Sequence, residues 1–328
     1  MTAPLVDIAD LVIGYDTGTR QVRALDGASL QVGEDETLAI VGESGSGKTT
    51  LGMAAGRLLP PEAQVISGNI HVASIDVTRA DDAALRRLRH DKLGFVFQNP
   101  ATALDPTMRI GRQVALAMGG RPAADSIAEL LSRAELNEPQ RILRAYPHEL
   151  SGGMAQRVVI AMAIARRPHL LIADEPTASL DASIREKVMA TLGRLRAESG
   201  ASLVILSHDL RMVARHADRV AVMYGGRIVE LGPVEEVMQA PSHPYTRALL
   251  AAAAGNERPG ERLRPIPGTP PMLEGRCEAC AYVPRCAFRA PRCKAERPEA
   301  RILAAREVVC HRAEEVIADD RPPRQEAR

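Results

Sequence analysis

The stretch GESGSGKT at residues 42–49 decides the fold of this chain. It fits the pattern G-x-x-x-x-G-K-[ST], in which successive backbone N–H groups surround phosphate oxygens where a helix begins. An apolar run at residues 37–41 (TLAIV) precedes it, and apolar residues at positions 50–59 have helical spacing. A buried strand, a glycine-rich loop and a helix therefore follow one another, which predicts an α/β fold built around a phosphate site.

Each fixed position of this loop has a chemical reason. Glycine at Gly42, Gly45 and Gly47 permits positive φ angles and a close approach of the backbone to phosphate. We expect Lys48 to reach the β- and γ-phosphates and Thr49 to ligate Mg²⁺. The other loop residues expected to contact the nucleotide are Glu43, Ser44, Ser46 and Thr50.

A second apolar run, at residues 170–173, ends in two carboxylates within the sequence LLIADEP. Open α/β sheets bind ligands at the carboxyl ends of their strands. Asp174 is therefore expected to hold Mg²⁺, directly or through water, and Glu175 to orient or deprotonate an attacking water. The alternative is that one of the two carboxylates caps a helix and the other is a solvated charge. The phosphate loop earlier in the chain favours the magnesium site over this alternative.

Between these two segments lies LSGGMAQ at residues 150–156. Ser151, Gly152 and Gly153 would open a helix through residues 154–166, whose N-terminus offers N–H groups and partial positive charge to a γ-phosphate. A serine-capped structural helix would explain SGG alone. The three segments together resemble the ATP-binding-cassette (ABC) ATPases, and the match extends over about residues 5–235.

The resemblance implies a P-loop NTPase (RecA-like) core with an antiparallel β subdomain and a helical subdomain near residues 99–164. It implies an ABC nucleotide-binding domain at residues 1–235 that binds ATP and Mg²⁺ and hydrolyses ATP. In this family the LSGG helix completes the site of a facing subunit, so two chains close head to tail around two ATP molecules. Ala155 stands where many relatives have a long polar residue, and alanine favours helix.

Smaller motifs of the family also have counterparts. Tyr15 resembles the aromatic residue that stacks on adenine; packing at a sheet edge is its alternative. Gln98 resembles the glutamine that contacts Mg²⁺ or water and couples to the membrane partner. His208, after the apolar residues 202–206, resembles the histidine that contacts the γ-phosphate, although a lone histidine is more often structural. Ser179, Leu180 and Asp181 resemble the D-loop, which implies a nucleotide contact from Asp181.

Composition limits the class of protein. The chain has 328 residues, 45% of them hydrophobic, and a net charge of +1. This balance does not favour binding to nucleic acid, and the low aromatic content of 2% leaves few stacking platforms for it. We find no run of 18 apolar residues and no signal peptide, so any pore must come from other subunits. One copy of each motif indicates a single cassette.

The sequence changes character after about residue 235. A proline-punctuated turn and a short helix are expected at residues 241–254, followed by an extended proline-rich linker at residues 263–273. All five cysteines follow this linker: Cys277, Cys280, Cys286, Cys293 and Cys310. In a reducing cytoplasm such clustering favours metal ligation or redox chemistry over disulfides.

The region after residue 235 indicates which branch of the family the chain resembles. HPYTRALL at residues 243–250, PIPGTPP at residues 265–271 and the pattern C-x5-C-x6-C-x16-C look like the Cys-rich C-terminal extension of oligopeptide, dipeptide and nickel importers. That resemblance assigns residues 236–328 to the extension and implies a 4Fe-4S cluster on Cys280, Cys286, Cys293 and Cys310. Zinc remains an alternative because Cys277 and Cys280 form C-x2-C, and free or redox-active thiols are another.

The function implied is ATP hydrolysis that powers import of peptides. Expected partners are a second ABC ATPase subunit, giving a heterodimer, two integral-membrane permease subunits and an extracytoplasmic substrate-binding protein, with no nucleic acid. The chain would then be peripheral, at the cytoplasmic face of the membrane. A nickel or other small-solute importer, and a soluble cassette ATPase of a carbon-phosphorus lyase-type complex, are the alternatives.

Overall fold

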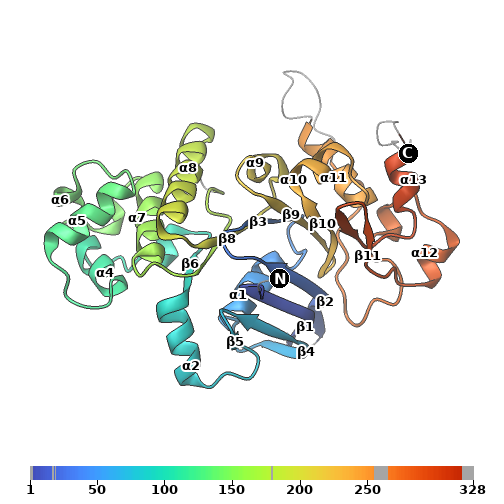
Figure 1. The fold of residues 1–328 in the computed structure, drawn as a ribbon, viewed down its shortest axis with the longest axis horizontal. Coiled ribbons are helices and arrows are strands. Elements are labelled where there is room, and N and C mark those ends of the chain that lie inside the picture. Colours follow the sequence, from blue (N-terminus) through green and yellow to red (C-terminus); the bar gives the residue numbers. More distant parts are fainter. Residues whose placement is uncertain (1–2, 17, 19, 179, 255–264, 320–328) are drawn as a thin grey trace.

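The computed structural model describes residues 3–16, 18, 20–178, 180–254 and 265–319. Its core is an eight-stranded sheet with the strand order β11-β12-β10-β9-β3-β8-β7-β6 (Figure 1). The strands from β6 to β9 are parallel, and those on the β10 side are antiparallel. Their bounds are β3 Thr37–Val41, β6 Leu93–Val96, β7 Leu170–Asp174, β8 Ser202–Ser207, β9 Arg219–Tyr224, β10 Arg227–Pro233, β11 Arg301–Leu303 and β12 Arg306–Val308.

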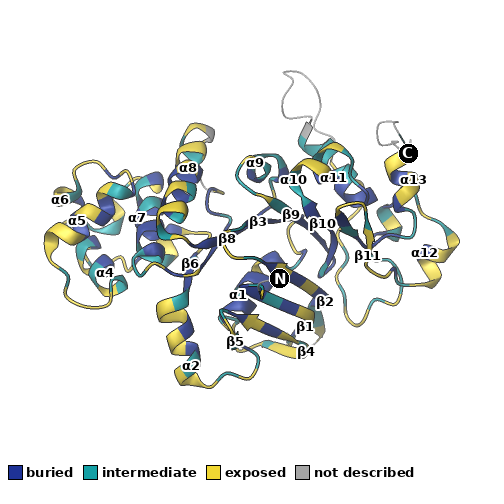
Figure 2. Cartoon of the chain, viewed as in Figure 1, coloured by how far each residue is buried: buried dark blue, intermediate teal, exposed yellow. Residues whose placement is uncertain are grey.

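The central strands are apolar because they are covered on both faces. All residues of β3, β7 and β8 are buried, and Figure 2 shows the strands of this sheet largely in dark blue. Helix α1 (Lys48–Ala55) packs on one face together with a second, antiparallel sheet of order β2-β1-β4-β5. The strands of that sheet are β1 Val6–Asp16, β2 Gln21–Val32, β4 Ala63–Val72 and β5 Ile75–Asp76.

A group of helices lies beyond α8 (Ala182–Ser199), at the left of Figure 1. It comprises α3 Pro100–Ala103, α4 Ile110–Ala117, α5 Ala124–Arg133, α6 Pro139–Ile142, the 3-10 turn Pro147–Glu149 and α7 Gly152–Ile164. Helix α2 (Asp82–Arg87) and the π-turn Leu88–Lys92 lead into β6. Helices α3 to α7 occupy the region, residues 99–164, that was expected to form a helical subdomain.

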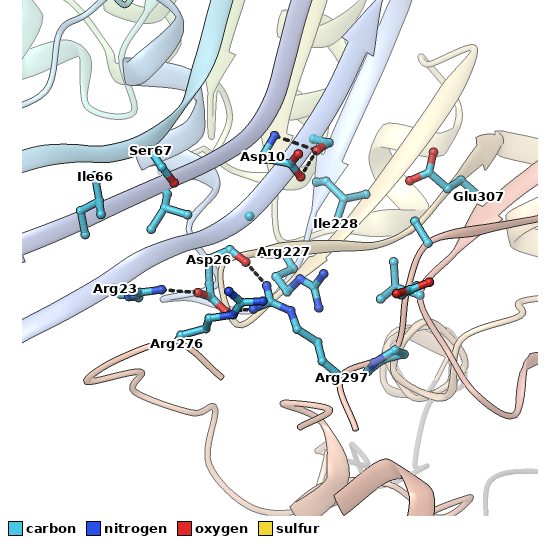
Figure 3. A pocket seen from close by; sticks show the side chains of 17 residues that line it. Asp10, Arg23, Asp26, Ile66, Ser67, Arg227, Ile228, Arg276, Arg297 and Glu307 are labelled. Atoms are coloured by element: carbon cyan, nitrogen blue, oxygen red, sulfur yellow. Dashed lines mark hydrogen bonds and ion pairs between the residues drawn. The ribbon is translucent and has the colours of Figure 1, made fainter. Parts of the chain in front are cut away.

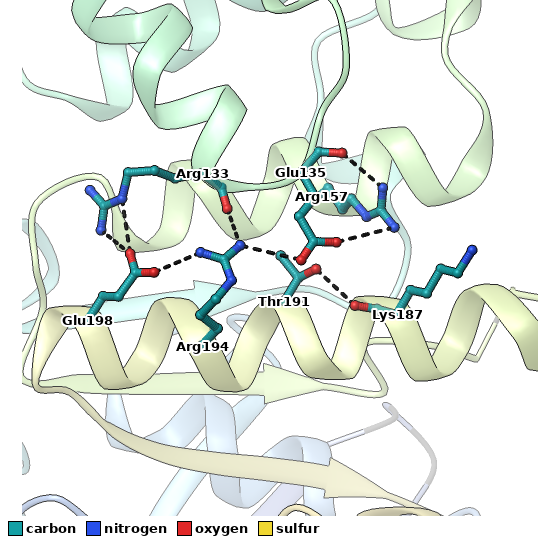
Figure 4. Close-up of polar contacts among 7 residues, drawn as sticks. All are labelled: Arg133, Glu135, Arg157, Lys187, Thr191, Arg194 and Glu198. Carbon is teal, nitrogen blue, oxygen red and sulfur yellow. Dashed lines mark hydrogen bonds and ion pairs between the residues drawn. The ribbon is translucent and has the colours of Figure 1, made fainter.

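Ion pairs join the helical group to α8 (Figure 4). Glu198 pairs with Arg133 at 2.8 Å and with Arg194 at 2.7 Å. Arg157 of α7 lies 3.9 Å from the Glu135 carboxylate and donates to the Glu135 carbonyl at 3.1 Å. Each pair is partly exposed and contributes little alone, so the network mainly fixes how α5, α7 and α8 are oriented.

The C-terminal extension is built into the main sheet, which the sequence did not predict. Strand β12 pairs with β10, where Glu230 faces Val308, and the Val309 N–H donates to the Val229 carbonyl at 2.9 Å. The remaining elements are α9 Leu210–Ala214, α10 Val234–Gln239, α11 Pro244–Ala254, the 3-10 turn Val283–Arg285, α12 Pro291–Ala295 and α13 Ala313–Ala318. The proposed division at residue 235 therefore falls between segments that share one sheet and one hydrophobic core.

A buried carboxylate organises this junction. Glu230 is fully buried and accepts hydrogen bonds from the backbone N–H groups of Ser242 at 2.7 Å and His243 at 3.0 Å. Burial raises the pKa of Glu230. The junction thus positions the chain that enters α11.

The observed bounds of two helices, α1 and α7, differ from those predicted from the sequence. Helix α1 begins at Lys48 and ends at Ala55, earlier than the predicted residue 59, because Gly56 caps it and Arg57 adopts a positive φ of 49°. Helix α7 begins at Gly152 because Ser151 is its N-cap, and it ends at Ile164. The predicted linker at residues 263–273 is described only from residue 265 onward.

Candidate functional site

The phosphate loop runs from the buried end of β3 to the first turn of α1. A Cβ on Gly42 would lie 2.2 Å from the Met223 carbonyl oxygen, and one on Gly47 would lie 2.5 Å from the Ala24 carbonyl oxygen. Gly47 also has a φ of 105°. Only glycine fits at these two positions.

Lys48 lies inside the loop that it closes. Its ammonium donates to the carbonyl oxygens of Gly42 at 2.7 Å and Glu43 at 3.0 Å. Burial lowers the pKa of Lys48, and the charges of Glu175 and Asp174 oppose that shift. The ammonium is therefore close to where a phosphate would bind.

Thr49 and Asp174 meet although 125 positions separate them. The Thr49 hydroxyl donates to the Asp174 carboxylate at 3.2 Å, because the helix after β3 and the end of β7 lie at the same edge of the sheet. Burial raises the pKa of Asp174, and the Thr49 hydrogen bond opposes this shift. A hydroxyl and a carboxylate are the hard oxygen donors that Mg²⁺ prefers, so these two residues fit the expected ion.

Glu175 and His208 form a second pair beside the first. The His208 Nδ1 lies 2.8 Å from a Glu175 carboxylate oxygen. Glu175 has a left-handed φ of 45°, and its N–H donates to the Leu206 carbonyl at 2.9 Å. Because β7 and β8 are parallel neighbours, both side chains emerge at the same edge. The hydrogen bond to Glu175 raises the pKa of His208.

Two further predicted residues lie at the margin of this site. The Tyr15 hydroxyl is 3.2 Å from the Thr50 hydroxyl, so the end of β1 reaches the start of α1. Gln98 is exposed two residues after β6, the neighbour of β7. Ser44 and Gly45 are exposed, and the Ser46 hydroxyl is buried without a hydrogen-bond partner among the described residues.

The LSGG segment lies apart from the other motifs. Ser151 and Gly152 are exposed, and the Ser151 hydroxyl caps α7 by accepting from the Met154 N–H at 3.4 Å. No hydrogen bond or ion pair within the described residues joins this segment to the phosphate loop. Asp181 is the exposed N-cap residue of α8, and Ser179 of the predicted D-loop lies outside the described residues.

The cysteines do not form a ready metal site. Cys286, Cys293 and Cys310 are buried, Cys280 is half-buried, and all are free thiols. In the part of the chain that the structure describes, no three His, Cys, Asp or Glu side chains are grouped to hold a metal ion. The expected 4Fe-4S site is therefore not preformed.

The thiols are nevertheless near one another. Burial raises the pKa of Cys286 to about 12 and that of Cys310 to about 11, and charges on neighbouring thiols contribute to both shifts. The Cys280 N–H donates to the Cys293 carbonyl at 3.0 Å. Cys277 lies close enough to Cys280 for its charge to help raise the pKa of that thiol, while its N–H donates to Asp26 at 3.4 Å. The four-thiol donor set matches the chemistry of a cluster.

Sequence patterns missed a link between the extension and the phosphate loop. Arg285 forms an ion pair with Glu43 at 2.6 Å, and the Glu43 N–H donates to the Tyr245 hydroxyl at 2.8 Å. Arg285 and Tyr245, the partners of Glu43, belong to no motif that marks a nucleotide site. Only the fold could reveal these contacts.

A separate cavity of about 590 Å³ lies between the antiparallel sheet and the extension (Figure 3). Asp26, which is 1% exposed, pairs there with Arg23 at 2.9 Å and Arg297 at 3.0 Å. None of the residues that line this cavity belongs to the predicted nucleotide site.

Comparison with known families identifies two regions of the chain. The ABC transporter family matches residues 25–178, and the family described as "Oligopeptide/dipeptide transporter, C-terminal region" matches residues 229–293. A putative peptide import ATP-binding protein of Brucella ovis is 40% identical over 313 residues, covering 90% of this chain and 93% of that protein. The oligopeptide transport ATP-binding protein OppD of Mycobacterium tuberculosis is 41% identical over 305 residues, covering 90% of this chain and 50% of OppD.

Solved structures agree. The ATP-binding cassette MJ0796, solved as a dimer in a post-hydrolysis state with ADP and Pi, is 32% identical with a TM-score of 0.62, covering 70% of this chain and 98% of that one. The cbiO1 protein of Clostridium perfringens, part of the ABC transporter complex cbiONQ, is 27% identical with a TM-score of 0.61, covering 72% of this chain and 91% of that one.

This chain belongs to the ABC transporter family and is an ATPase with the C-terminal region of the oligopeptide/dipeptide transporters. The expected P-loop NTPase fold and the family resemblance are confirmed. None of the helices in the described segments combines the length and hydrophobicity needed to cross a bilayer.

The pair of Glu175 and His208 predicts a pH dependence. The pKa of His208 is raised above its ordinary value of 6.5, so the protonated pair stabilises the folded chain below about pH 6.5, and this contribution is lost as the pH rises through the raised pKa. We expect an NMR titration of His208 to have a midpoint above 6.5 that moves back toward 6.5 in Glu175→Gln. An identical midpoint in the variant would contradict this pairing.

Proposed function

We propose that this ABC-family ATPase binds and hydrolyses ATP to power import of peptides across a membrane. The observation that carries the activity is the meeting of Lys48, Thr49, Asp174, Glu175 and His208 at one edge of the sheet. The C-terminal match to oligopeptide/dipeptide transporters supports the cargo class, and the names of the relatives agree with it.

In this mechanism the chain holds the triphosphate by its backbone and by one cation. The N–H groups of residues 44, 45 and 47–49 and the Lys48 ammonium bind phosphate oxygens, while Tyr15 stacks on the adenine. Thr49 and Asp174, with Gln98, would hold Mg²⁺, which neutralises charge on the phosphates. Thr50 would support the loop through its contact with Tyr15.

Hydrolysis then depends on one positioned water. Glu175 accepts a hydrogen bond from the water and orients it toward the γ-phosphate. His208 holds the Glu175 carboxylate through the 2.8 Å contact and can donate to a γ-phosphate oxygen. Catalysis by these residues is positioning and electrostatic stabilisation, without a covalent enzyme intermediate.

The active form in this proposal is a pair of cassettes. Ser151, Gly152 and Gly153 at the start of α7, together with Asp181, complete the ATP site of a facing subunit. The exposure of Ser151, Gly152 and Asp181 supports this role, as does the dimeric state of the solved relative MJ0796. A second, different cassette subunit and an extracytoplasmic binding protein would complete the transporter at the cytoplasmic face of the membrane.

A groove beside Gln98 is suited to a permease segment. It has a volume of about 620 Å³ and lies between β6, α4 and α7. Phe97 is 40% exposed and Leu116 is 62% exposed, which is unusual for large apolar residues in a water-facing wall. We assign the groove to a helical segment of an integral-membrane partner, since its neighbour Gln98 would then link partner and ATP site.

The extension would carry a 4Fe-4S cluster on Cys280, Cys286, Cys293 and Cys310. Four neighbouring thiols, three of them buried, support this proposal. Their side chains would have to turn toward a common centre, and binding would require their deprotonation.

Replacing the water-positioning carboxylate should separate ATP binding from hydrolysis. Glu175→Gln keeps the shape of the side chain but removes its negative charge, so we expect turnover to fall by about 100-fold or more, with ATP still bound. Size-exclusion chromatography with Mg·ATP should show a stable dimer with the proposed partner. Hydrolysis at the original rate would overturn the assignment of Glu175.

A charge in the groove should uncouple the chain from the membrane. Leu116→Glu places a carboxylate on the surface proposed for the permease, so co-purification with integral-membrane proteins should be lost. ATP binding by the isolated subunit should persist, because Leu116 is outside the nucleotide site. The matched control is Val65→Glu, an apolar residue 43% exposed on the antiparallel sheet. Equal co-purification of both variants would exclude this groove as the docking site.

Metal analysis distinguishes a 4Fe-4S cluster from bound zinc and from free thiols. Anaerobically purified protein should contain iron and acid-labile sulfide and absorb visible light. Cys286→Ser should abolish all three signals, whereas Cys277→Ser should retain them. Zinc in place of iron, or no metal at all, would refute the cluster.

A further inference from the structure

The extension reaches into the ATP site through one side chain. Arg285, in the turn between Cys280 and Cys286, makes a two-pronged contact with Glu43 of the phosphate loop: Nη1 to Oε2 at 2.6 Å and Nη2 to Oε1 at 2.9 Å. The side chain of Arg285 is 3% exposed and that of Glu43 is 25% exposed. Such fork-shaped pairs are geometrically specific as well as strong.

The Arg285 guanidinium is itself held in place. Its Nε donates to the Pro267 carbonyl at 2.7 Å, and Nη2 also donates to the Ile266 carbonyl at 3.2 Å. The group lies over the rings of Tyr224 and Tyr282, 5.7 Å and 6.0 Å from their centroids. The guanidinium is therefore oriented before any nucleotide binds.

Glu43 is fixed at its backbone as well. Its N–H donates to the hydroxyl of Tyr245, a residue that is fully buried. Tyr245 packs against Tyr224 and Tyr282 with ring centroids 4.5 Å and 5.4 Å apart. The part of the chain after the cassette motifs thus holds both the main chain and the carboxylate of Glu43.

This contact matters because Glu43 is an acid in a loop that must bind a triphosphate. The Glu43 carbonyl accepts from the Lys48 ammonium, and the negative charge of Glu43 also acts on Lys48. Without a counter-charge, that carboxylate would repel phosphates and attract the ammonium that should bind them. Arg285 supplies the counter-charge.

We propose that Arg285 is a positioning residue for ATP: by neutralising and orienting Glu43, it keeps Lys48 and the phosphate loop available to the nucleotide. The proposal rests on the nucleotide site described above and is independent of the cluster. ATP affinity then depends on the folded extension, because Arg285 acts on the nucleotide site through Glu43.

The experiment measures ATP binding and turnover separately. Arg285→Met removes the charge but retains much of the apolar stem, leaving Glu43 unpaired. We expect the Kd for ATP to rise by about tenfold or more, while kcat at saturating ATP changes by less than about threefold, because Glu175 and His208 follow β7 and β8, whereas Glu43 follows β3. An unchanged Kd in a folded variant would overturn the proposal.

A double variant distinguishes neutralisation from simple anchoring. In Glu43→Gln/Arg285→Met the unpaired carboxylate is gone, so most of the lost ATP affinity should return. If the pair only anchored the extension, the double variant would bind ATP as weakly as Arg285→Met, and that result would overturn the proposal.

Arg297→Met is the matched control. It also removes an extension arginine from a buried cassette carboxylate, Asp26, at 3.0 Å, but this carboxylate is not part of the phosphate loop at residues 42–49. Its Kd for ATP should match that of the unmodified chain even if its thermal stability falls, and an equal loss of affinity in both variants would contradict a specific role for Arg285. Should Arg285→Met fail to fold, Arg285→Gln takes its place: a raised Kd with retained kcat supports the proposal, and an unchanged Kd overturns it.

Discussion

The parallel hydrogen bonding of β3, β8 and β7 is the constraint on which the rest of the structure depends. Ala39, Ile205 and Ala173 lie in register across these strands. Because parallel strands end at the same edge, Lys48, Asp174 and His208 arrive together although the sequence separates them widely. Burial on both faces of the strands then excludes water from beneath the site and shifts the pKa values of Asp174 and Lys48 in opposite directions.

Residues within strong local patterns could be predicted from the sequence. Strand β3 and its loop were predicted because glycines, a lysine and a preceding apolar run occur at fixed spacings. Asp174 and Glu175 followed from the same logic. The contacts of Thr49 with Asp174 and of His208 with Glu175 needed the family resemblance, because spacing along the chain does not say which strands are neighbours.

The features that the sequence could not predict are contacts between residues that lie far apart along the chain. Strand β12 has only three residues, and nothing in them specifies pairing with β10. Arg285 is one of many arginines, and its partner Glu43 lies 242 positions earlier. The cysteine spacing predicted a set of four thiols as ligands, but ligating geometry depends on rotamers that spacing does not determine.

The ion pair between Glu43 and Arg285 couples the free energy of nucleotide binding to the free energy of ordering the extension. Linkage is reciprocal: if an ordered extension favours nucleotide binding, bound nucleotide must stabilise the extension by the same free energy. The segment around the thiols would then report the nucleotide state of the cassette, and its protection from hydrogen exchange would rise and fall during each round of ATP hydrolysis. The C-terminal extension, which pairs with one side of the sheet, thereby becomes a sensor of ATP hydrolysis at the centre of the sheet.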